Sequence, residues 1–156
     1  MKMSHEGVQV LIEMEGSKAT AYRDSAGLLT IGVGHLLTKD ELSSGKIVLG
    51  GVPVKWRAGL TADQVDSLLS QDIAPVENAV TAAVKVPLTE DQFDALVCFA
   101  FNVGTGAFRN SGLLRKLNSG NYAAVPTQMR RWVYAGGEVV TGLANRREKE
   151  ISLWMA

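Results

Sequence analysis

The apolar positions along the chain change from helical spacing to strand spacing and back to helical spacing. Val8, Leu11 and Ile12 recur at helical spacing, which predicts a helix over residues 4–14. Residues 19–35 instead hold strand formers around an Asp-Ser-Ala-Gly turn signal, which predicts a β-hairpin.

Three capping boxes mark the starts of further helices. Each is a threonine followed three residues later by Glu or Gln, at Thr38, Thr61 and Thr89. The second box opens an apolar ladder over 61–83, in which Pro75 is expected to kink or interrupt the helix. Residues 43–59, between the first two boxes, are expected to form an irregular loop with some strand pairing.

The second half of the chain is predicted to be helical. The helix after Thr89 is apolar on almost every face up to about Phe101, so it should be the central buried helix. Further helices are expected from Ser111 to Asn118, from about 122 to 133, and over 143–155. A hairpin followed by mostly helical segments predicts an α+β fold in which helix dominates.

Composition is that of an ordinary globular protein of 156 residues, with 46% hydrophobic and 21% charged residues. Sixteen basic residues balance sixteen acidic ones, so the net charge does not favour nucleic-acid binding. Any attraction to an anionic cell wall would have to come from a local patch. Cys98 is the only cysteine, which excludes an intrachain disulfide, and its apolar neighbours predict a buried thiol.

No targeting segment, membrane span or metal site is indicated. The apolar stretch from Val8 to Ile12 is too short for a signal peptide or a membrane span, so we expect folding in the cytoplasm and no membrane insertion. His35 and His5 lack the spacing of a metal site, and no cofactor is expected.

Three residues taken singly have both a structural and a chemical interpretation. Glu15 extends the apolar face of the first helix, where it is either a helix-end carboxylate turned to solvent or a general acid. Asp24 fits the first position of a type I turn, and Thr30 fits a strand.

Their spacing is more specific than the single residues. Eight residues separate Glu15 from Asp24 and five separate Asp24 from Thr30, within Glu15-Gly, Tyr22-Arg-Asp and Thr30-Ile-Gly-Val-Gly-His. This segment resembles the catalytic signature of the phage lysozymes of glycoside hydrolase family 24. The resemblance continues in Leu36-Leu-Thr38, in Ala95-Leu-Val through Phe101-Asn-Val-Gly104, and in Gly142-Leu143 with Arg146-Arg147 and Glu150.

The resemblance implies a lysozyme-like fold in a single domain spanning 1–156. We expect a β-containing lobe at about 16–60, a connecting helix at 61–83, and a helical lobe at about 84–156 together with 1–14. The family pattern is not matched in the 43–59 loop or at Pro126, where some relatives carry a polar residue that faces the sugar.

The resemblance also implies a role for each matching residue. Glu15 would protonate the leaving oxygen, Asp24 would stabilise the oxocarbenium-like transition state and help to hold the attacking water, and Thr30 would orient that water. Leu36, Phe101 and Ser111 would line the sugar subsites, with Asn102 as a neighbour. Two residues would give structural support: His35 would pin the hairpin, and Arg146 would hold Glu15 in position.

The expected activity is hydrolysis of the β-1,4 bond between N-acetylmuramic acid and N-acetylglucosamine in peptidoglycan, by an inverting displacement. Cleavage of the wall in this way would lyse the bacterial host of a phage. The protein is expected to act as a monomer and to depend on a separate pore-forming holin for release from the host cytoplasm. A lytic transglycosylase and an inactive wall-binding module remain alternatives, and chitin cleavage is an expected side activity. Residues Asp24 and Thr30 favour hydrolysis, because transglycosylases by analogy need only the glutamate.

Overall fold

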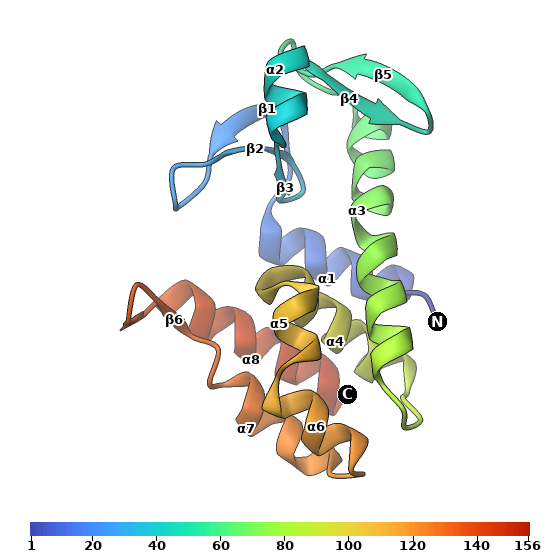
Figure 1. Cartoon of the computed structure of the whole chain (residues 1–156), viewed down its shortest axis with the longest axis vertical. Helices are drawn as coiled ribbons and strands as arrows, with labels where there is room; N and C mark the ends of the chain where they lie inside the picture. The colour runs from blue at the N-terminus through green and yellow to red at the C-terminus, as the bar shows by residue number, and fades with distance from the viewer. The chain divides into compact units, whose positions relative to one another are not determined.

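The structure, a computed structural model, describes residues 1–156 and divides into two compact units. One unit is Leu11–Ala74, and the other joins Met1–Val10 to Pro75–Ala156. The chain passes between them inside α1 (His5–Glu15) and inside α3 (Ala62–Ala83). Helix dominates both the element order and Figure 1, which confirms the α+β, mostly helical class. The single-domain assignment and its lobe boundaries stay a prediction.

The predicted N-terminal hairpin is present in the Leu11–Ala74 unit as part of a three-stranded antiparallel sheet. Its strands are β1 (Lys18–Arg23), β2 (Leu29–Gly32) and β3 (His35–Leu36), in the order β1-β2-β3. The backbone N–H of Asp24 donates to the carbonyl of Leu28, which closes the β1–β2 turn at 2.9 Å.

The strand pairing expected within residues 43–59 is present, and it is more regular than the predicted loop. After α2 (Lys39–Ser44), which begins at the predicted Thr38 capping box, β4 (Lys46–Leu49) and β5 (Val52–Lys55) pair through four consecutive positions. Gly50 and Gly51 both have positive φ, as a two-residue hairpin turn requires. The apolar runs on either side of these glycines are therefore the two strands of a hairpin.

Helix α3 continues through Pro75, so the expectation that Pro75 interrupts the helix is wrong, while the alternative of a kink stays a prediction. Proline removes one helical hydrogen bond and costs about 3 kcal/mol inside a helix. Buried apolar side chains flank it on both sides, at Leu69 and Ile73 before it and at Val76 and Val80 after it. Because burying each such side chain contributes about 1.5–3 kcal/mol, packing outweighs the lost hydrogen bond.

The second unit is built around α4 (Glu90–Val103), which packs against α8 (Thr141–Met155). Every residue of α4 from Phe93 to Ala100 is buried, including Cys98, which confirms α4 as the buried helix. The remaining elements are α5 (Thr105–Arg109), α6 (Gly112–Asn118), the 3-10 helix η1 (Tyr122–Ala124), α7 (Val125–Met129), β6 (Tyr134–Ala135) and β7 (Glu138–Val139).

The helix expected over about 122–133 is shorter than predicted, because α7 ends at Met129. Beyond it the backbone tightens into turns, in which the N–H of Trp132 donates to the carbonyl of Met129. The N–H of Arg131 likewise donates to the Gln128 carbonyl, so hydrogen bonds between residues three apart replace the helical ones. None of the helices is both long and apolar enough to cross a membrane.

Candidate active site

The turn between β1 and β2 fixes the Asp24 side chain. Its Oδ1 accepts from the backbone N–H groups of Ala26 at 2.9 Å and Leu28 at 2.8 Å. No residue of the protein hydrogen bonds Oδ2. The carboxylate is therefore anchored through one oxygen and presents the other for chemistry.

The sheet brings two of the predicted site residues to one face. Thr30 on β2 lies directly opposite Tyr22 on β1 and Leu36 on β3. Directly opposed residues project from the same face of a sheet, and so do residues two apart along a strand. Thr30 and Leu36 therefore share a face with Tyr22, and Asp24 follows directly after the end of β1.

The Thr30 hydroxyl has a fixed hydrogen-bond direction. It is almost fully buried, with 4% of the residue exposed, and it donates its proton to the Leu28 carbonyl at 3.0 Å. Toward any further partner, Thr30 Oγ1 can therefore act only as an acceptor. Leu28 thus binds both Asp24 and Thr30 through its backbone.

Glu15 is the last residue of α1, and its carboxyl group lies against Gly34 in the turn between β2 and β3. A Cβ placed on Gly34 would overlap Glu15 Oε1 and lie 3.1 Å from its Cδ. Gly34 also has φ +65, a conformation that favours glycine. The carboxyl group of Glu15 therefore fills the space that any side chain at position 34 would need.

Tyr22 belongs to the same group of side chains, although only its place in the motif was recognised in the sequence. Burial raises the pKa of the Tyr22 phenol, and the negative charges of Glu15 and Asp24 raise it further. Both carboxylates therefore lie close enough to Tyr22 to act on it. The Lys18 ammonium stands 4.5 Å from the centroid of the Tyr22 ring.

Each ring nitrogen of His35 contacts a carboxylate. Its Nδ1 lies 2.7 Å from Asp72 Oδ2 on α3, and its Nε2 lies 2.8 Å from Glu41 Oε1 on α2. Burial by itself lowers the pKa of His35, but the hydrogen bonds and charges of Asp72 and Glu41 raise it to about 9. The histidine is thus positioned to tie β3 to two helices, as a residue with a structural role would be.

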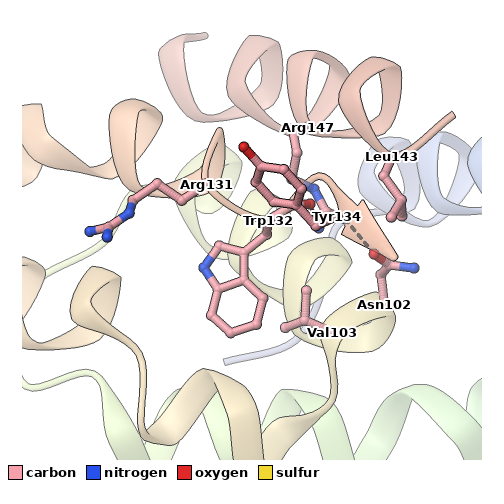
Figure 2. A pocket seen from close by; sticks show the side chains of 7 residues that line it. All are labelled: Asn102, Val103, Arg131, Trp132, Tyr134, Leu143 and Arg147. Carbon is pink, nitrogen blue, oxygen red and sulfur yellow. Dashed lines mark hydrogen bonds between the residues drawn. The ribbon is translucent and has the colours of Figure 1, made fainter. Parts of the chain in front are cut away.

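The other predicted binding residues belong to the unit that contains α4, and two of them line cavities. Asn102 borders a cavity of about 320 Å³ and Ser111 borders one of about 420 Å³. Arg131 and Trp132, which sequence reasoning did not select, line both. Figure 2 shows the Trp132 indole beside Val103, with Asn102 joined to Arg147.

Ser111 and Phe101 have limited freedom to contact a ligand directly. The Ser111 hydroxyl donates to the Phe108 carbonyl and accepts from the N–H of Leu114, as the N-cap of α6. Phe101 is partly buried. The approach of these residues to Leu36 in the other unit stays a prediction.

A buried cluster of charges, which sequence reasoning did not anticipate, links α8 to α4. Glu150 is completely buried and pairs with Arg146, whose Nε donates to Glu150 Oε2 at 3.1 Å, and with Arg147, whose Nε lies 2.7 Å from Oε1. Burial raises the pKa of Glu150, and the two arginines oppose that rise. The helical i, i+3 and i, i+4 spacing of these residues was the available signal.

Arg146 also donates to the Cys98 carbonyl at 2.9 Å, and Arg147 donates to Asn102 Oδ1 at 2.6 Å. The cluster thereby fixes the backbone of α4 and one predicted binding residue. The expected support of Glu15 by Arg146 joins residues of different units and stays a prediction.

Comparison with known proteins gives a consistent result. The chain is 42% identical over 146 residues to the SAR-endolysin of Escherichia phage Mu, covering 94% of this chain and 77% of that protein. It is 37% identical to the endolysin of Salmonella phage P22, covering 100% and 99% of the two chains. The muramidase domain of SpmX from Asticaccaulis excentricus superposes with a TM-score of 0.81 at 33% identity, covering 99% and 98%.

The match to a family model is equally extensive. The phage lysozyme family model covers residues 12–150, which include the segment from Glu15 to His35 and the C-terminal Arg146-Arg147. The chain therefore belongs to the phage lysozyme family of glycoside hydrolases.

Proposed function

We propose that the protein is a phage endolysin that hydrolyses the β-1,4 bond between N-acetylmuramic acid and N-acetylglucosamine in peptidoglycan, by an inverting single displacement. It acts as a monomer, needs neither metal nor cofactor, and lyses the host cell. A separate holin releases it from the host cytoplasm to the wall. The observation that carries the mechanism is the shared hydrogen bonding of Asp24 and Thr30 to Leu28.

The attacking water is held by two acceptors. Thr30 Oγ1 can only accept, because its own proton is donated to Leu28, and Asp24 Oδ2 is the second acceptor, on a carboxylate that Leu28 also binds. A water that donates one hydrogen to each directs its lone pairs away from the sheet and toward the sugar. Asp24 then takes the proton as the water adds to the anomeric carbon.

Glu15 supplies the proton on the leaving side. Its carboxylic acid protonates the glycosidic oxygen as the bond to the anomeric carbon breaks, and Asp24 stabilises the positive charge that develops on the sugar. The packing of this carboxyl group against Gly34 supports the role, because a general acid must be held at a fixed position. Leu36, Phe101, Asn102 and Ser111 are proposed to contact the glycan.

Product analysis tests both the bond and the stereochemistry. Inversion of a β-linked glycan releases the α-anomer first, and NMR of fresh digests should show it before mutarotation. Initial β-anomer would require Asp24 to act as a nucleophile, whereas anhydro sugars in place of reducing ends would indicate a lytic transglycosylase.

The general acid is tested by Glu15→Gln, which should fold normally and lose at least about 10²–10⁴-fold in activity. Glu13→Gln, an exposed change on the same helix, is the matched control and should clear a peptidoglycan suspension at the wild-type rate. Full activity in folded Glu15→Gln protein would exclude this mechanism. Binding to the wall without clearance by the wild type would identify an inactive wall-binding module.

A further inference from the structure

The β4–β5 hairpin presents an exposed face that the catalytic proposal does not use. Lys46 lies directly opposite Lys55, and Val48 lies opposite Pro53, so these four residues share one face. The alternate residue Ile47 is buried on the other face. In Figure 1 the hairpin lies at the end of its unit that is away from α1.

Three cations gather at the base of this hairpin. Lys46, Lys55 and Arg57 line a cavity of about 240 Å³ that has no carboxylate in its wall. Arg57 is fixed by donating to the Leu42 carbonyl at 2.7 Å and by stacking over Trp56. Like charges placed directly opposite on a sheet are destabilising, and an anion between them would relieve that repulsion. In a chain of zero net charge, this is a local positive patch.

The tip of the hairpin is apolar and held in place. Val48 is 55% exposed and Val52 is 61% exposed. Gln71 on α3 holds the tip, because it accepts from the N–H of Gly50 and donates to the Val48 carbonyl. Lysines on edge strands prevent pairing with other sheets, but exposed valines do not serve that purpose.

We propose that this hairpin docks the protein reversibly on an anionic phospholipid surface. The docking surface consists of the face that carries Lys46, Val48, Pro53 and Lys55, together with Arg57 at its base and Val52, which lies opposite Leu49, at its tip. Its cations contact headgroup phosphates, while the valine tip enters the interface between headgroups and acyl chains. A soluble phosphate polymer would satisfy the cations equally well but would leave the apolar tip without a partner, which is why a lipid surface fits better.

Vesicle binding tests the docking surface. Sedimentation with vesicles of mixed phosphatidylglycerol and phosphatidylcholine should capture the protein, whereas pure phosphatidylcholine should not. Replacing both lysines, as Lys46→Gln with Lys55→Gln, should weaken binding about 30-fold, since each cation near an anionic membrane contributes about 1 kcal/mol. The control Lys85→Gln with Lys149→Gln removes the same charge from exposed positions elsewhere and should change binding less than about 3-fold.

Substitution of the two valines at the tip distinguishes binding to a membrane from binding to a soluble polymer. Val48→Ser with Val52→Ser should weaken vesicle binding and leave unchanged any binding to a soluble glycerol-phosphate polymer. No variant should melt below the wild type, and all should cleave soluble glycan fragments normally. Vesicle binding that is insensitive to the valines, or a control pair that loses as much as the lysine pair, would overturn the proposal.

Discussion

Gly34→Ala should disable the general acid without unfolding the protein. The new methyl group would overlap Glu15 Oε1 and lie 3.1 Å from Cδ, so the carboxyl group would have to move by about 1 Å to regain normal contact. A displacement of that size at a reacting group lowers the rate by about 10²-fold, or about 2.7 kcal/mol in the barrier. The loss should appear in kcat, because the glycan contacts stay in place.

Gly32→Ala is the matched control for this prediction. Gly32 has φ +64, almost the same as Gly34, so alanine is strained to the same degree at both positions, by about 1–2 kcal/mol. Its added Cβ would meet Leu68 Cδ2 at 3.5 Å, an ordinary contact, and would not touch Glu15.

The two variants should therefore melt about 2–8 °C below the wild type, while only Gly34→Ala loses activity. The assay is kcat on a defined glycan fragment at a temperature where circular dichroism shows both variants folded. A Gly34→Ala enzyme within about 3-fold of the wild-type kcat, or an equal loss in Gly32→Ala, would refute the steric reasoning.

Three further predictions follow from the hydrogen-bond and charge networks. The pKa of His35 is raised from 6.5 to about 9 in the folded protein. The contacts of protonated His35 therefore contribute fully to the free energy of unfolding below pH 6.5, and this contribution is lost as the pH rises from 6.5 to 9. The full pKa shift corresponds to about 3.4 kcal/mol of unfolding free energy, which solvent screening reduces to about 1–2 kcal/mol. Urea titrations should show this loss in the wild type but not in His35→Gln. Glu150→Gln removes the buried carboxylate that pairs with both Arg146 and Arg147 and should cost about 3–5 kcal/mol of unfolding free energy in urea, whereas a cost below about 1 kcal/mol would contradict the buried-pair interpretation. Thr30→Val removes the acceptor for the water and should lower kcat by about 10²-fold, with Thr30→Ser recovering most of it in the same assay; equal rates for the two would exclude the hydroxyl from the mechanism.

Local sequence signals predicted most of the elements. The boxes at Thr38 and Thr89 cap their helices through reciprocal hydrogen bonds, as the residue types indicated. The signals were less informative where distant residues decide the structure. Gln71 of α3 holds the β4–β5 hairpin, and the turns that begin after Met129 make α7 shorter than predicted.

In the candidate site, too, local signals predicted some features and contacts between distant residues decided others. The motif spacing selected Asp24, Thr30 and Glu15, and the backbone of Leu28 joins the first two through hydrogen bonds. The contact between Glu15 and Gly34 could not be predicted, because it depends on how the end of α1 packs against a turn nineteen positions further along the chain. Arg131 and Trp132 carry no motif and were found only because they line cavities.

The backbone of Leu28 tolerates far less change at this turn than its side chain does. Its N–H and carbonyl bind Asp24 and Thr30, while its side chain is 50% exposed. Most side chains should therefore be tolerated at position 28, and a label attached there would report on the turn without entering it. Proline would remove the N–H that holds Asp24, and a single inserted residue would break the register between the two partners. Variation at this position is thus restricted by the main chain, and a comparison of side-chain chemistry alone would rank it as unimportant.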